Sequence, residues 1–225
     1  MNNAWLKVCI FVLGCFALAA CQKPTVTQQT DSQGLAKVEN TGMAAAKADP
    51  SVNFSQFNDV VIADIDFAHL QIVQPTDSSP RYGAFTLEEK DKAQMRDAYR
   101  EQVGSELGKG GWQVVDANSA KRAGTLVIFT EMLRLQPNAP REQSERFTQS
   151  ARDKTFTKGA GSMTLESSVI DAGTGKTVAV FGDTLLDTEV WGQNDPVANR
   201  AAVERAFSSW GLKIRDTLRA LRGSH

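Results

Sequence analysis

Four carboxylates and one histidine are the side chains whose types and spacing could support acid–base chemistry. Asp64 and Asp66 lie two residues apart in an alternating apolar segment, so a strand there would place both on one face. Glu131 and Glu166 lie in two further strand-like segments and would form a pair if those strands placed them opposite each other. Paired carboxylates can act as general acid and base. The plainer interpretation of His69 and of the two aspartates is polar residues on a solvent-facing strand, although a histidine can also sense pH.

The segment Gly173–Thr177 reads GTGKT, which looks like the end of a phosphate-binding loop. The complete pattern requires another glycine five positions before Gly175, where this sequence has Ile170. Such a loop also leads into a helix, whereas Val178–Leu186 alternates as a strand does. We therefore predict that Asp171–Lys176 is the turn of a β-hairpin and that the protein binds no nucleotide.

Histidine is scarce, which limits the metal and nucleophile chemistry open to this protein. The only histidines are His69 and the terminal His225, too few for most zinc sites or for a Ser-His-Asp arrangement. The sequence carries 25 basic and 26 acidic side chains. This balance argues against a nucleic-acid-binding protein, which needs a strongly basic face. We expect no metal, no cofactor and no nucleic acid partner.

Residues 1–20 have the pattern of an export signal. One lysine precedes Val8–Ala20, an apolar stretch that ends in small residues and is too short to span a bilayer comfortably. Leu18–Cys21 reads LAAC and resembles the cleavage box of bacterial lipoproteins, in which the cysteine becomes the acylated first residue of the mature chain. The resemblance implies lipid attachment at Cys21. Cys9 and Cys15 would leave with the leader, so no disulfide is expected.

Residues 21–53 are expected to be the acylated cysteine followed by a flexible tether. The stretch from 22 to 50 is rich in Gln, Thr, Ala, Lys and Asp, and it has no aromatic residue and no sustained apolar period. Gln22 stands where an aspartate holds many Gram-negative lipoproteins in the inner membrane. Resemblance to that sorting pattern implies the outer membrane, with retention through Lys23 as the alternative.

Apolar periodicity over residues 54–222 predicts one folded domain. Strands are expected at 60–73, 112–115, 125–135, 162–170 and 178–186, with a helix after Thr86 and a second helix starting at Pro196. The apolar stripes are Met95, Tyr99, Val103 and Leu107 on the first helix and Val203, Phe207, Trp210, Ile214, Leu218 and Leu221 on the second. The order β-α-β-β-β-β-α predicts an α+β fold, with both helices packed on one mixed sheet of about five strands.

Residues 136–158 form a long connection that contains basic and acidic residues together with Phe147 and Phe156. A connection of this length inside a compact domain is usually functional or mobile. We interpret it as a solvated insertion, with partner binding through the two phenylalanines as the alternative. Trp191, after the last hairpin, is expected to close the end of the core.

From residue 123 to residue 221 the sequence resembles a family of Gram-negative lipoproteins known only as a domain of unknown function. The resemblance rests on a strand ending in Thr130-Glu131, on Gly159–Gly161, on Asp171–Lys176 and on a closing helix with a central tryptophan. These are turn and packing motifs, so the resemblance implies a fold and brings no catalytic residue. Similar lipid-anchored domains occur in envelope assembly and secretion accessory proteins.

The leading hypothesis for function is a non-enzymatic lipoprotein, anchored through Cys21 to the periplasmic face of the outer membrane and acting on an envelope protein partner. The alternatives are a hydrolase that uses some of the four carboxylates, and a carrier of a small apolar ligand between sheet and helices. A deep pocket lined by carboxylates would favour the hydrolase and a continuous apolar cavity the carrier, whereas a filled core would favour the binding module.

Overall fold

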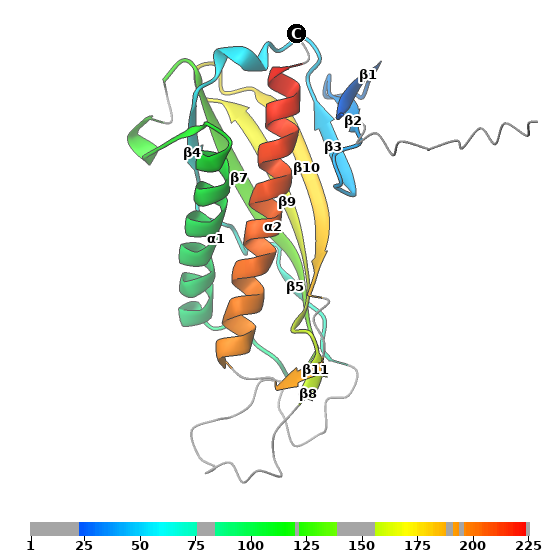
Figure 1. The fold of residues 1–225 in the computed structure, drawn as a ribbon, viewed down its shortest axis with the longest axis vertical. Helices are drawn as coiled ribbons and strands as arrows, with labels where there is room; N and C mark the ends of the chain where they lie inside the picture. The colour runs from blue at the N-terminus through cyan, green and yellow to red at the C-terminus, as the bar shows by residue number, and fades with distance from the viewer. Residues whose placement is uncertain are drawn as a thin grey trace, which may run out of the picture.

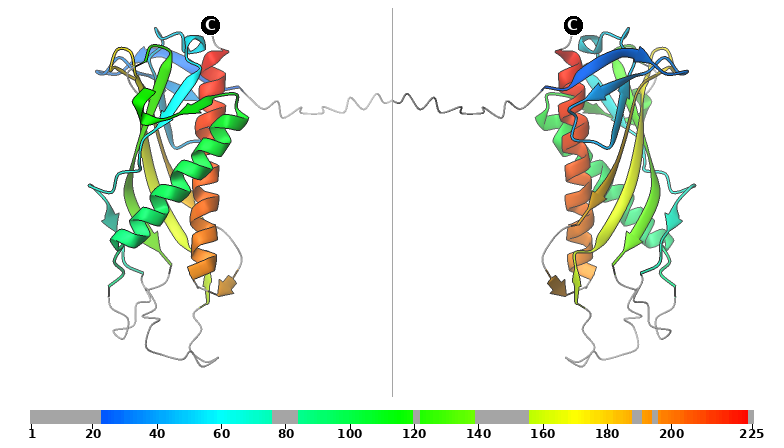
Figure 2. Two further views of the ribbon diagram at one scale, coloured as in Figure 1. Left: turned by 90° about the vertical axis from the view of Figure 1, so that its left-hand side faces the viewer. Right: turned by 90° about the vertical axis from the view of Figure 1, so that its right-hand side faces the viewer.

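The structure of this protein is a computed structural model that describes residues 23–75, 84–119, 122–138, 156–187, 191–193 and 196–223. Two helices, α1 (Glu89–Lys109) and α2 (Pro196–Arg222), lie side by side on one face of a twisted β-sheet (Figure 1). Figure 2 shows the two layers from the side, with the sheet on one side of the helices. This is the two-layer arrangement that amphipathic helices need in order to bury their apolar faces.

Within the described residues the main sheet has nine strands, in the order β1-β2-β3-β10-β9-β7-β4-β6, and β5 pairs with β7 beside this path. These strands are β1 (Thr25–Thr30), β2 (Ala36–Glu39), β3 (Ala45–Ala48), β4 (Asp59–Ile62), β5 (Gln71–Ile72), β6 (Gln113–Val115), β7 (Thr125–Pro137), β9 (Gly161–Asp171) and β10 (Thr177–Leu186). A separate small sheet pairs β8 (Phe156–Lys158) with β11 (Trp191–Gln193). The pairs β4–β6, β4–β7 and β5–β7 are parallel, and the remaining pairs are antiparallel. The predicted α+β fold, with two helices on one mixed sheet, is confirmed, and the sheet is larger than expected.

The N-terminal strands β1, β2 and β3 extend the sheet where a flexible tether was expected, so that prediction is wrong for residues 25–48. β3 pairs with β10, and β2 and β1 follow in antiparallel order. The inward side chains of these strands are small and buried, namely Ala36, Val38, Ala46 and Ala48. The folded domain therefore begins near Thr25 and not at residue 54.

The strand expected over residues 60–73 is interrupted. Its first part is β4 and its last part is β5, and both run parallel to β7. Ile62 lies opposite Ile128, and Ile72 lies opposite Leu135. The chain from β4 to β5 therefore uses ten residues to cover the length that β7 covers with seven. The extra residues form bends between the two strands, where one isolated bridge remains at Asp66. A bulged segment of this kind re-aims its side chains away from regular alternation.

Both predicted helical stripes face the sheet. Every stripe residue of α1 is buried, and on α2 all are buried except Val203, which is partly buried. Trp210 is fully buried, as predicted. Pro196 opens α2 as predicted, whereas α1 is capped by Glu88, whose N–H donates to the Asp91 carboxylate at 3.0 Å, and not by Thr86.

The two helices pack closely where α2 carries Gly211. A Cβ at this position would lie 2.9 Å from the Val103 Cα on α1, so the contact requires glycine. Nearby, Arg215 donates to Glu106 at 2.8 Å.

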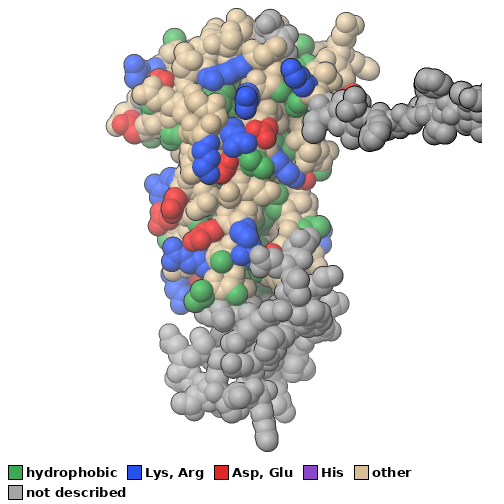
Figure 3. Space-filling model, in the orientation of Figure 1, with side chains coloured by type: hydrophobic (Ala, Val, Ile, Leu, Met, Phe, Trp, Pro, Cys, Tyr) green, Lys and Arg blue, Asp and Glu red, His purple; other side chains and the backbone are tan. Residues whose placement is uncertain are grey.

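Figure 3 shows basic and acidic side chains interspersed over this face of the molecule. Within the described ranges, neither helix combines the length and the apolarity that crossing a membrane requires.

Candidate functional site

The outer face of the sheet, away from the helices, carries Glu131 and Glu166 directly opposite each other. β7 and β9 are antiparallel, and their register pairs the two glutamates. Their neighbours Thr130 and Ser167 are also paired, and both are fully buried. Because strand side chains alternate between faces, the glutamates point outward. These two glutamates could form a pair only if they faced each other. The structure meets this condition, with the two Cβ atoms about 5 Å apart.

His69 and Asp66 lie beside Glu131 on this face. His69 Nδ1 is 3.6 Å from Glu131 Oε1, and Asp66 forms the isolated parallel bridge with Glu131. The Asp66 carboxylate accepts the backbone N–H of Ala68 at 2.9 Å, which holds the bend after β4. His69 exposes 73% of its side chain and Glu131 exposes 30%. The group is a solvent-facing acidic surface that can accept hydrogen bonds or pair with a cation.

Asp64 does not join this acidic surface. Its carboxylate lies 3.2 Å from Arg100 Nε on α1. The hypothesis of a carboxylate pair formed by Asp64 and Asp66 is therefore not supported, because one residue contacts a helix and the other stabilises a bend. Among the described residues, no three His, Cys, Asp or Glu side chains are grouped so that they could hold a metal.

A chain of buried hydrogen bonds links both helices to the sheet, and sequence reasoning missed it. Tyr99 Oη lies 2.5 Å from Thr130 Oγ1, which lies 2.5 Å from Ser167 Oγ. Trp210 Nε1 donates to the same Ser167 oxygen at 3.2 Å. Burial raises the pKa of Tyr99 well above its ordinary value, so its hydroxyl stays protonated. The chain satisfies polar atoms inside the core and thereby fixes how the layers pack.

The GTGKT segment is the turn of a hairpin between β9 and β10, as predicted. Asp171 closes this turn, because its carboxylate accepts the Gly173 N–H at 2.9 Å and the Thr174 hydroxyl at 2.8 Å. A strand follows the turn, whereas a phosphate-binding loop needs the N-terminus of a helix there.

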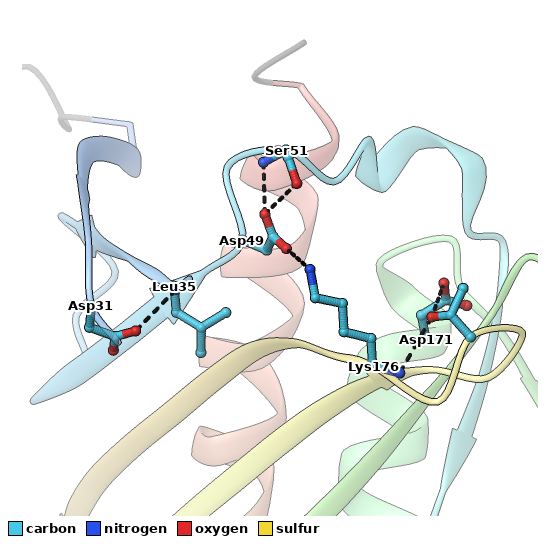
Figure 4. A network of polar contacts seen from close by, with 7 residues as sticks. Asp31, Leu35, Asp49, Ser51, Asp171 and Lys176 are labelled. Carbon is cyan, nitrogen blue, oxygen red and sulfur yellow. Dashed lines mark hydrogen bonds and ion pairs between the residues drawn. The ribbon is translucent and has the colours of Figure 1, made fainter. Parts of the chain in front are cut away.

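Lys176 extends from this turn to Asp49, which follows β3 (Figure 4). Lys176 Nζ lies 2.7 Å from Asp49 Oδ2, and Asp49 Oδ1 accepts the Ser51 N–H at 2.9 Å and the Ser51 hydroxyl at 2.6 Å. Burial by itself would raise the pKa of Asp49. The hydrogen bonds from Lys176 and Ser51 outweigh burial and hold that pKa below its ordinary value. The lysine of the apparent nucleotide motif therefore ties the N-terminal strands to the hairpin.

We expect Lys176→Ala to lower the free energy of unfolding by about 1 kcal/mol at neutral pH, because the variant loses a charged hydrogen bond to a buried carboxylate. Since the pKa of Asp49 is lowered in the folded state, this stabilisation is present above the unfolded-state pKa of about 3.9 and is lost as the pH falls through the folded-state value. Urea unfolding at neutral pH and again at about pH 2.5 should show the difference between the two proteins shrinking.

Lys37→Ala is the matched control for Lys176→Ala. Lys37 pairs with Glu39 at 3.3 Å, and both side chains of this pair are exposed. Loss of an exposed ion pair changes stability by less than about 0.5 kcal/mol. Equal losses in the two variants would contradict the structural role assigned to Lys176.

The Gly159–Ala160–Gly161 motif fastens the far ends of β7 and β10. The Ala160 N–H donates to Asp187 Oδ2 at 2.7 Å, and the Ala160 carbonyl accepts the Asn138 N–H at 3.0 Å. Gly161 has φ +132°, and a Cβ there would lie 2.1 Å from the Gln136 carbonyl oxygen. The motif is thus a close crossing of backbones, in agreement with its interpretation as a turn and packing motif.

Some predicted features lie outside the described residues. These are the export signal over residues 1–20, Cys21, Gln22, residues 139–155 of the long connection, the side chains of Phe156 and Trp191, and His225. The described ends of the long connection are the end of β7 and the strand β8. At the other end of the chain, β1 begins only four residues after Cys21.

One family model, described as "Protein of unknown function (DUF3313)", matches residues 27–214. The matched range runs from β1 into α2, so it includes the N-terminal strands as well as the hairpin and the helices. None of the curated proteins matches the sequence at a significant level.

Solved structures resemble the fold only distantly. A dodecamer of a PelC point variant from Paraburkholderia phytofirmans is 10% identical with a TM-score of 0.38, covering 78% of this chain and 98% of that chain. XCC0632 from Xanthomonas campestris, of family DUF330, is 11% identical with a TM-score of 0.42, covering 69% and 80%. A candidate lipoprotein from Caulobacter crescentus CB15 is 13% identical with a TM-score of 0.39, covering 77% and 95%. Likenesses at this level carry no inference about assembly or activity.

Proposed function

This chain belongs to the family of proteins of unknown function DUF3313, and from that premise we propose that it is a lipid-anchored envelope protein whose folded domain acts by binding. The observation that carries the proposal is the position of the lipoprotein box. Leu18–Cys21 ends four residues before β1, so only a short link would separate an acyl group on Cys21 from the folded domain. Lys23, in the short link, is exposed.

The interior of the domain supports a binding module over a carrier. Large side chains from both layers are fully buried between sheet and helices, among them Tyr99, Phe181, Phe207 and Trp210. The buried hydroxyl groups of Thr130 and Ser167 are occupied by one another and by Tyr99 and Trp210. A protein partner would contact the surface, where the acidic residues around Glu131 are one candidate contact.

We expect Cys21→Ser to abolish acylation and to release the domain from the membrane fraction or to leave it as uncleaved precursor. A single acyl chain gives only marginal binding, but several chains, each worth about 0.8 kcal/mol per buried CH₂, hold a protein firmly. Metabolic labelling with an alkyne fatty acid, followed by membrane fractionation, measures both effects. Cys15→Ser is the matched control, because that cysteine lies in the leader and should leave labelling unchanged.

Fatty-acid labelling that survives in Cys21→Ser would overturn the anchoring proposal. Co-fractionation of cleaved, unlabelled Cys21→Ser protein with outer membranes at the wild-type level would overturn it too. Crosslinking in intact envelopes, followed by identification of the attached protein, then tests whether the anchored domain has a protein partner.

The proposed destination is the periplasmic face of the outer membrane. Gln22 occupies the sorting position after the acylated cysteine, where aspartate would favour retention in the inner membrane. We expect the wild-type protein to sediment with outer-membrane markers in a sucrose gradient and Gln22→Asp to move toward inner-membrane fractions. Gln22→Ser is the control for substitution itself. Wild-type protein in the inner-membrane fractions would contradict the proposed destination.

A further inference from the structure

The short link between Cys21 and β1 determines which flank of the domain can face a bilayer. An extended chain spans at most about 3.6 Å per residue, so Thr25 lies within about 14 Å of a lipid-bearing Cys21. The strands β1, β2 and β3 form one flank of the domain, and Thr25 is the first residue of β1 (Figure 1). This inference rests on the proposed anchor and adds to it an orientation and a lipid contact.

The exposed face of this flank carries two lysines in register. Lys37 on β2 and Lys47 on β3 are direct cross-strand partners, while the residues on either side of each lysine point inward and are buried. Lys37 exposes 70% of its side chain and Lys47 exposes 48%. Like charges in direct register repel, so this arrangement favours an anion that contacts both. Lys23 adds a third exposed cation in the link to the anchor.

The acids beside these lysines only partly neutralise them. Lys47 pairs with Asp31 at 2.8 Å, and Lys37 pairs with Glu39 at 3.3 Å. Counted with Lys23, three lysines and two acids leave one net positive charge on the flank. Each lysine has three donors, so it can keep its carboxylate partner and still donate to a second oxygen.

The acidic surface limits how much of the sheet can approach an anionic bilayer. Along one row of the sheet Ala45 lies opposite Gly182, and Gly182 lies opposite Glu166. Glu166 is therefore two strands, or about 10 Å, from the flank and sits beside Glu131. The carboxylates would be repelled by lipid phosphates, so the domain would rest on its edge strands and turn the acidic surface outward.

We propose that the outer face of β1–β3 lies against the headgroups of anionic phospholipids, with Lys37 and Lys47 contacting their phosphate oxygens. The lipid on Cys21 provides attachment, and the lysines orient the domain. A lipid chain and a basic surface together hold a protein to a membrane more firmly than either one does alone.

The test measures how close two sites on the mature, acylated protein lie to the bilayer. Ala45→Cys places a fluorophore on the flank, and Gln113→Cys places the same fluorophore on β6, the opposite edge of the sheet; both positions are exposed. An acylated Cys21 has no free thiol, so labelling is confined to the new cysteine. The protein is reconstituted in vesicles of phosphatidylethanolamine and phosphatidylglycerol that contain a headgroup-nitroxide lipid as quencher.

We expect quenching at position 45 to exceed that at position 113 by about threefold and to weaken at high salt or in phosphatidylcholine vesicles. The double variant Lys37→Gln/Lys47→Gln in the Ala45→Cys protein should lose about half of the quenching or more. Lys90→Gln/Lys109→Gln is the matched control, because it removes two exposed lysines from α1.

Equal quenching at the two sites, or quenching that the Lys37→Gln/Lys47→Gln change leaves intact, would overturn the proposed orientation while leaving the anchor in place. Mass spectrometry of the mature N-terminus separates the two proposals. A Cys21 without acyl chains would overturn the proposed function and this inference together.

Discussion

Replacement of Trp210 with alanine should lower the free energy of unfolding by about 4 kcal/mol, because the substitution opens a large cavity in a closely packed core. Trp210 is fully buried between α2 and the sheet, and its indole N–H donates to Ser167 Oγ at 3.2 Å. The alanine variant loses the packing of the indole and also one donor of the buried hydrogen-bond chain. Urea unfolding followed by far-ultraviolet circular dichroism measures the loss.

Two further variants separate the contributions at Trp210. Trp210→Phe keeps most of the apolar volume and removes the N–H, so it should cost clearly less than the alanine variant. Leu212→Ala, two residues away on the same helix and 41% exposed, should change stability by less than about 0.5 kcal/mol. Indole fluorescence at Trp210 that acrylamide quenches fully in the folded protein would contradict its burial.

Gly161→Ala should destabilise the domain by about 3 kcal/mol or more, because two separate penalties act at this position. The backbone has φ +132°, a region that residues with a side chain rarely adopt. A Cβ would also lie 2.1 Å from the Gln136 carbonyl oxygen and 2.9 Å from the Pro137 Cα, so β7 itself would have to move. Thermal and urea unfolding of the purified variant measure the loss.

Gly175→Ala is the control that isolates the backbone penalty. Gly175 has φ +71° in the β9–β10 turn, and nothing lies within 4 Å of a Cβ built there. Only the left-handed conformation is penalised, at about 1–2 kcal/mol. If both alanine variants lost the same stability, the backbone contact between Gly161 and the end of β7 would not have the importance assigned to it.

Tertiary contacts determine whether the N-terminal strands form and where the strand over residues 60–73 is interrupted. The inward residues of β2 and β3 are mostly alanine, which strands ordinarily disfavour, and the segments are only four residues long. They form because β10 offers an edge for β3 to pair with. Likewise, the bends between β4 and β5 depend on the register with β7, which local alternation does not encode.

The buried hydroxyl chain shows a signal that sequence reasoning could have used. Thr130 occupies a core-facing position between Ile128 and Met132, where an apolar residue is expected. A polar residue in phase with a buried strand face needs a partner inside the core. Its partners come from residues 31 and 37 positions away in the sequence, so their identity required the packed structure.

The sequence by itself determined the features that depend on local periodicity and turn chemistry. These are the two amphipathic helices, the β9–β10 hairpin, the burial of Trp210 and the α+β class of the fold, because each follows from residues close together along the chain. Only the tertiary structure decided that Glu131 faces Glu166 and that Lys176 meets Asp49, residues 127 positions apart. Such contacts depend on strand register and on which edge each strand joins, and both are set by the packing of the whole sheet.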